Sequence, residues 1–200
     1  MKDVKEIVRG GVSVVGEGFD VTNFETGGTS PGDVAAAIAG ATLYGLTSDV
    51  TAVEELEFEI SEYDGKPGRT MHDSSPRKAN LTVSFNLKQM NGELLGNVYA
   101  TLANEAGEPV GFDKVTRELD PDKYNYQDNV FFIGLRKDKK YFILVIDKAA
   151  SESPLDLSFT DGEDVTHMVE FMANYDMTNI RANIDRTLTA PYKLYIGQTT

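Results

Sequence analysis

The residues that could carry catalysis or bind a metal are few in this chain of 200 residues. It has no cysteine and only two histidines, His72 and His167. His72 lies beside Asp73 in a polar stretch, which is typical of a solvated loop residue or a contact residue. His167 shares the apolar alternation of Val165 and Val169, so we expect a partly buried packing residue and not a base or a metal ligand.

Familiar catalytic and metal-binding motifs are absent from the sequence. It has no nucleophile elbow, phosphate loop, dinucleotide fingerprint, paired-histidine zinc motif or calcium loop. The acidic run 161–164 has the wrong carboxylate spacing for an EF-hand, and its Asp-Gly pair is an ordinary hairpin turn. Since there is no thiol, disulfides and thiolate zinc sites are excluded as well. We expect no enzymatic activity, no cofactor and no metal.

Carboxylates recur instead on one side of the segments that alternate polar and apolar residues. This period of two is found in segments 53–60, 81–87, 155–160 and 165–171. The polar side of these segments has no Lys or Arg, and its carboxylates are Glu55, Glu57, Glu59, Asp156 and Glu170. A merely solvated sheet face usually mixes charges of both signs. A face without cations instead suits a polyanion that passes without being held.

Basic residues gather in two segments outside these expected strands. The polar stretch 61–80, between the first two strands, contains Lys66, Arg69, Arg77 and Lys78. A charged turn at 136–140 contains others. Ordered loops as long as 61–80 are usually functional or become ordered on a partner. We therefore expect segment 61–80 to be an assembly loop that contacts a neighbouring subunit.

The first half of the chain predicts few regular elements besides these strands. Residues 1–40 are rich in glycine and predict an N-terminal arm, with a short strand at 12–15 and a short helix capped by Ser30. One amphipathic helix is predicted over residues 92–104. Its apolar face is indicated by Leu94, Leu95, Val98 and Leu102.

The second half predicts a buried hairpin and a final strand. Residues 108–129 are polar and indicate loops. The apolar runs 130–136 and 141–147 flank a charged turn, which is typical of a hairpin buried on both faces. A short strand is expected over 192–196. We therefore expect a single, mainly β domain that spans residues 1–200.

The charge balance also limits the possible partners. The chain has 32 acidic and 19 basic residues, for a formal net charge of -13. Tight binding of nucleic acid phosphates needs clustered Lys and Arg, so such binding is not expected. The uncharged stretch Val34 to Ser48 is too short to span a bilayer, and residues 1–19 lack the apolar region of a secretory signal. We expect no membrane partner and no export.

Three segments follow one another in a recognisable order. They are the strand Val53-Glu-Glu-Leu-Glu-Phe-Glu-Ile60 before the long loop, Leu81-Thr-Val-Ser-Phe-Asn-Leu87 running into Asn91-Gly-Glu-Leu-Leu95, and the stretch from Ser153 to Phe171. This order resembles the major tail tube proteins of long-tailed bacteriophages, over roughly residues 42–175. The first 40 residues and the stretch 104–129 lie outside the resemblance.

The resemblance implies a β-sandwich or partial barrel with one packed α-helix and a long β-hairpin loop. Copies of the chain would form hexameric rings, in which their strands make one continuous β-barrel, and the rings would stack helically into a tail tube. DNA would pass through the acidic lumen during ejection without specific binding. Further partners would be tail proteins such as the tape measure and the terminator, in a virion tail assembled in the host cytoplasm.

The resemblance also implies places for the charged residues. The residues facing DNA in the lumen would be Glu55, Glu57, Glu59, Asp156 and Glu170. The residues of the loop that contacts the next subunit or ring would be Lys66, Arg69, Arg77 and Lys78. A barrel of about 24 strands, spaced about 4.8 Å apart and tilted by about 40°, has a diameter of roughly 48 Å, which is wide enough for duplex DNA.

Two other interpretations remain open at the level of the sequence. The inner tube of a contractile injection machine would have the same fold, and a surrounding sheath would distinguish it. A stand-alone acidic β-sandwich that binds carbohydrate or another protein would expose aromatic residues on loops, and Tyr124 and Tyr126 form such a group.

Overall fold

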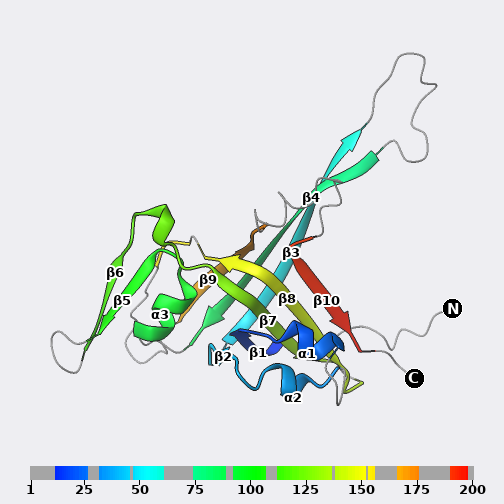
Figure 1. Cartoon of the computed structure of the whole chain (residues 1–200), viewed down its shortest axis with the longest axis horizontal. Coiled ribbons are helices and arrows are strands. Elements are labelled where there is room, and N and C mark those ends of the chain that lie inside the picture. Colours follow the sequence, from blue (N-terminus) through cyan, green and yellow to red (C-terminus); the bar gives the residue numbers. More distant parts are fainter. Residues whose placement is uncertain are drawn as a thin grey trace.

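The computed structural model describes residues 12–26, 32–45, 47–60, 74–88, 92–106, 112–136, 138–151, 153–155, 166–175 and 190–197. As predicted, the fold is mainly β (Figure 1). The strands are β1 (Val12–Glu17), β2 (Thr42–Leu43), β3 (Thr47–Ile60), β4 (Ser74–Leu87), β5 (Leu102–Ala106), β6 (Asp113–Arg117), β7 (Gln127–Leu135), β8 (Tyr141–Ala150), β9 (His167–Ala173) and β10 (Tyr192–Ile196). The helices are α1 (Val21–Thr26), α2 (Val34–Ala37), α3 (Gly92–Val98) and the short 3-10 helix η2 (Pro121–Lys123).

Eight of these strands form one antiparallel sheet. Its order is β2-β1-β7-β8-β9-β4-β3, and β10 also pairs with β8. Strands β5 and β6 form a separate two-stranded sheet, which lies with α3 at one side of the molecule (Figure 1).

The β7–β8 hairpin is buried on both faces, which confirms the prediction from its two apolar runs. Phe132 and Ile146 point into the larger core on one face. On the other face, Phe131 and Val145 belong to a second core, which α1 and α2 cover. A strand buried on both sides needs nearly continuous apolar sequence, as these strands have.

Residues 12–26 and 32–40 pack into the fold and do not form the arm predicted for residues 1–40, whereas residues 1–11 and 27–31 lie outside the described residues. Strand β1 pairs with β7, and the ring of Phe19 packs on the ring of Phe131 with a centroid distance of 5.6 Å. Helix α2 is capped by Asp33, whose carboxylate accepts hydrogen bonds from the next backbone N–H groups. The expected cap, Ser30, lies outside the described residues. The short strand expected at 12–15 is confirmed as β1. The arm was wrongly predicted because the glycine-rich composition indicated loops and did not reveal that aromatic residues such as Phe19 anchor the segment.

The main sheet curls strongly around its larger core. Phe85 on β4 packs edge-to-face on Phe132 of β7, with ring centroids 5.8 Å apart. Strands β9 and β8 lie between these two in the sheet order. A flat sheet would separate β4 and β7 by about 14 Å, at about 4.8 Å per strand. The sheet is nevertheless not a closed barrel, because its end strands β2 and β3 do not pair with each other.

The helix predicted over 92–104 is shorter, and the segment after it forms an unpredicted hairpin. Helix α3 ends at Val98, and β5 begins at Leu102 and pairs with β6. Leu94, Leu95 and Leu102 are buried as their spacing predicted, although Leu102 reaches the core from a strand. The spacing did not reveal the turn at 99–101. Helix α1 was not predicted either, whereas α2 lies within the segment where a short helix was expected.

The long hairpin β3–β4 projects from the body of the molecule (Figure 1). Its pairing confirms the expected hairpin, and the alternating residues of β4 are buried as predicted: Leu81, Val83, Phe85 and Leu87. The expected loop 61–80 is wrong at its C-terminal end, because β4 begins at Ser74. Arg77 and Lys78 therefore belong to a strand. Pairing with β3 extends β4 toward its N-terminal end, beyond the residues whose apolar alternation predicted the strand.

The C-terminal strands follow their predicted positions closely. Strand β9 starts at His167, two residues after the expected start, and β10 has the expected bounds of 192–196. Of the strand predicted over 155–160, only Leu155 is described, and it packs against the larger core.

We predict that Gly16→Ala destabilises the fold. A Cβ atom at Gly16 would lie 2.4 Å from the backbone oxygen of Thr42 and 2.9 Å from Cζ of Phe131. Relieving this overlap requires β2 to move, at a cost of about 1–3 kcal/mol in the free energy of unfolding. Urea unfolding measures the loss. Gly40→Ala is the control, since nothing lies within 4 Å of its added Cβ, and an equal loss in both variants would contradict this packing.

Candidate functional site

Strands β3, β4 and β9 bring three of the predicted lumen carboxylates to one face of the sheet. Glu55 lies opposite Asn80, and Glu57 lies opposite Lys78. Glu170 lies opposite Ser84. Residues directly opposite each other in an antiparallel pair share a face. We name this side of β3–β4–β9 the acidic face.

Hydroxyl and amide side chains occupy most of the acidic face between these carboxylates. Thr82, Ser84 and Asn86 of β4 are half-buried there. Met168 and Met172 of β9 lie opposite Asn86 and Thr82 and add apolar surface. The other predicted lumen residues cannot be placed on it: Glu59 has a described backbone in β3 but no described side chain, and Asp156 lies outside the described residues.

The acidic face is not free of cations, which corrects the sequence prediction. The Lys78 ammonium lies 2.8 Å from a carboxylate oxygen of Glu57, and both side chains are about half exposed. An exposed pair of this kind contributes about 1 kcal/mol or less to stability. The sequence did not predict a lysine on this face, because Lys78 was expected to lie in the loop 61–80. The acidic face therefore carries less net negative charge toward the outer part of the β3–β4 hairpin.

The other residues of the predicted contact loop are only partly described. Arg77 lies in β4 where the register with β3 shifts, between the pairs Glu57–Lys78 and Phe58–Pro76. Such a bulge adds one residue to a strand and increases its twist. Lys66 and Arg69 lie outside the described residues.

Strand β3 forms a free edge of the sheet and is exposed along most of its length. Residues 51–58 are all exposed, although Val53, Leu56 and Phe58 are large and apolar. Among the described residues, β3 pairs only with β4. A long exposed edge strand presents a row of unpaired backbone groups with which another strand can pair. This edge is therefore a candidate contact surface.

His167 is a packing residue, as predicted. It is 2% exposed, and its ring stacks on Tyr99 with a centroid distance of 6.4 Å. Neither ring nitrogen has a hydrogen-bond partner in the described part of the chain. Burial lowers the pKa of His167 below its usual value. The second histidine, His72, lies outside the described residues.

The described residues contain no group of three or more His, Asp or Glu side chains placed to hold a metal ion. No helix in the described ranges is long and apolar enough to cross a membrane. Of the aromatic pair in the loop before β7, Tyr126 is exposed and Tyr124 is half-buried.

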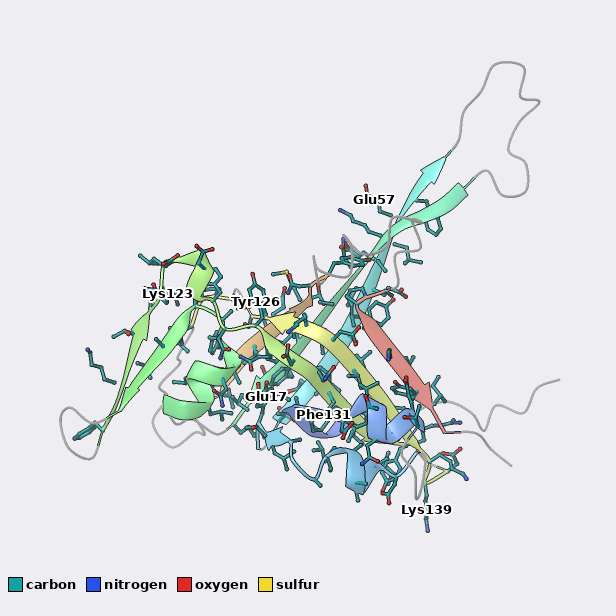
Figure 2. The ribbon with its side chains drawn as sticks, viewed as in Figure 1. Glu17, Glu57, Lys123, Tyr126, Phe131 and Lys139 are labelled. Atoms are coloured by element: carbon teal, nitrogen blue, oxygen red, sulfur yellow. The ribbon has the colours of Figure 1, made fainter. Side chains whose placement is uncertain are left out.

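A basic turn beside β10, at residues 136–140, forms a second charged surface. Arg136 donates a hydrogen bond of 3.2 Å to the backbone oxygen of Gly197, directly after β10, and pairs with Asp138 at 3.3 Å. Lys139 is exposed at the tip of this turn (Figure 2). The run of basic residues at 136–140 is visible in the sequence. Its position next to the C-terminal end of β10 follows only from the pairing of β10 with β8.

No protein-family model fits the chain, and no curated protein matches its sequence. The acidic face and the β3 edge are the two features of the structure that bear on function.

We predict that acid weakens the fold through His167. The unfolded chain, with a pKa near 6.5, takes up a proton before the folded chain does. Stability that is complete above about pH 6.5 is therefore lost as the pH falls toward the lower folded-state pKa. His167→Leu should lose less unfolding free energy than the wild type between about pH 7.5 and 5.5, by urea unfolding.

His72→Leu serves as the matched control for this series. It removes the other histidine, which we predict to be solvated, and should keep the pH dependence of the wild type. Equal pH dependence in His167→Leu and the wild type would contradict the burial of a neutral imidazole.

Proposed function

We propose that this chain is a structural subunit that assembles with copies of itself into a tube that conducts DNA. The observation that carries the proposal is the free edge of β3, which exposes apolar side chains along residues 51–58. As in the tail tube proteins that the sequence resembles, the subunits would form hexameric rings with a continuous β-barrel. The rings would stack into a virion tail tube, together with proteins that set its length and end it.

Burial of apolar side chains would drive the assembly. Val53, Leu56 and Phe58 are each about half exposed in the single chain. Covering such a side chain contributes roughly 1 kcal/mol, at about 25 cal/mol for each Å² of apolar surface removed from water. Pairing of backbone groups along the same strand would add direction and register to this contact. Pairing with a neighbouring strand would thus cover the apolar side chains and the unpaired backbone groups that β3 exposes to water in a monomer.

The composition of the acidic face suits a channel wall for DNA. Glu55 and Glu170 have no ion-pair partner among the described residues, so their charges repel phosphates. Hydroxyl and amide groups of β4 between them keep the wall hydrated without holding DNA. Lysines at these positions would instead form phosphate contacts that must be broken in series as DNA passes. Lys78 is held by Glu57, which reduces its attraction for phosphate.

Electron microscopy of the purified protein tests the assembly. At increasing protein concentration, negative-stain images should show rings or tubes with a central hole, and averaged end views should show hexameric symmetry. Uniform single particles at every concentration would refute the proposal. Rings without a hole would leave self-assembly standing but exclude a channel.

The lumen assignment predicts that Glu55→Lys tubes retain DNA. Tubes assembled with linear duplex DNA and treated with nuclease should protect more DNA in the variant than in the wild type. Protection should fall about tenfold or more between about 50 and 200 mM salt, because phosphate contacts release counterions. Asp122→Lys is the control, because it changes the charge equally on η2, outside the acidic face. Equal protection in both variants would place Glu55 outside the lumen.

A further inference from the structure

We propose that neighbouring copies join by pairing the free edge of β3 in one copy with the free edge of β10 in the next. This inference rests on the self-assembly proposed above and names the two strands that make the contact. Among the described residues, β3 pairs only with β4, and β10 pairs only with β8. Within the described ranges, each strand therefore has an outer row of backbone N–H and C=O groups that a further strand could pair.

The two edges are held close at one point and then separate. The hydroxyl of Tyr192, at the start of β10, donates a hydrogen bond to Glu54 of β3. From this point β3 continues into the projecting hairpin, while β10 runs away from it along β8 (Figure 1). Both edges are thus directed away from each other, and neither covers the other within one chain.

Both edges expose apolar side chains on the side of the sheet that faces the core. Leu56 lies opposite buried Ala79, and Leu194 lies opposite buried Leu144. Opposite residues share a face, so both leucines continue the core side of the sheet. Leu56 is 47% exposed and Leu194 is 56% exposed. If β3 and β10 of two copies paired, these side chains would meet on the core side and extend the apolar core across the contact.

The charges around the two edges are complementary. Strand β3 contains Glu54, Glu55, Glu57 and Glu59. Lys78 neutralises Glu57, whereas Glu55 has no ion-pair partner among the described residues. β10 ends beside the basic turn, since the Gly197 N–H donates a hydrogen bond of 2.9 Å to the backbone oxygen of Tyr141. Lys139 and Lys140 of this turn have no ion-pair partner among the described residues. Complementary potentials favour the correct pairing of two surfaces and speed their association.

The acidic residues of β3 and the basic turn lie too far apart to meet inside a single chain. Glu57 lies on the projecting hairpin, and Lys139 lies at the opposite end of the molecule (Figure 2). A contact between two different surfaces of identical chains is heterologous, and its repetition gives a closed ring or an open filament. A second copy of this chain is thus the occupant that matches both edges in backbone pairing, apolar side chains and charge.

Single substitutions at each edge test the contact. Leu56→Lys and Leu194→Glu change exposed positions, so the monomer should keep its fold, which circular dichroism and thermal unfolding check. Each variant alone should associate at least about tenfold more weakly than the wild type in sedimentation velocity, because it buries an unpaired charge at the contact. Phe112→Lys is the matched control, at a residue 69% exposed and remote from both edges, and should associate like the wild type.

Mixing the two edge variants in equal amounts provides the decisive measurement. In an alternating assembly, the two introduced charges, which have opposite signs, would face each other at one contact. Wild-type edges would meet at the next contact, so association should recover. Recovery supports the contact, even if the particles lack a channel and the proposed function fails. Tubes that form from each variant as well as from the wild type overturn the contact and leave the proposed function intact. A wild type that stays monomeric overturns both.

Discussion

The burial of the β7–β8 hairpin on both faces is the constraint on which the rest of the structure depends. One face needs a cover of helices, which the N-terminal residues supply through Phe19 and the short helices α1 and α2. The other face needs a second layer of apolar side chains, which β4 and β9 supply by curling over it. Because β9 and β4 follow β8 in the same sheet, the curl is part of the sheet itself and needs no second sheet.

With this arrangement the main sheet does not close into a barrel, and its edge strands remain exposed. Among the described residues, β7 and β8 have neighbours on both edges, whereas β2, β3 and β10 have a neighbour on one edge only and expose apolar side chains. A closed barrel would remove such edges within one chain. In an open sheet, the edge strands can be paired only by strands of another chain. The exposed edges of the monomer are therefore the physical reason for the proposed assembly.

The acidic face illustrates how tertiary pairing changes the meaning of a charge pattern. Period-two alternation correctly placed Glu55, Glu57 and Glu170 on the side away from the core. It did not reveal that the strand continues through Lys78, because that segment has no apolar alternation of its own. Its register partner on β3 is Glu57, and the two charges form an ion pair. A face that looked uniformly negative along the sequence therefore has a neutralised end in space.

The sequence alone determined the mainly β class, the buried hairpin, the apolar side of β4 and the packing role of His167, because alternation and continuous apolar runs report burial residue by residue. Only the tertiary structure decided where strands stop, which edges stay free and which charges meet. Those features depend on hydrogen bonds between segments far apart in the chain, as between β3 and β4 or β10 and β8. Local patterns carry no information about such partners. The boundary of the loop predicted at 61–80, the packing of the N-terminal residues onto β7 and the β5–β6 hairpin therefore became apparent only in the folded chain.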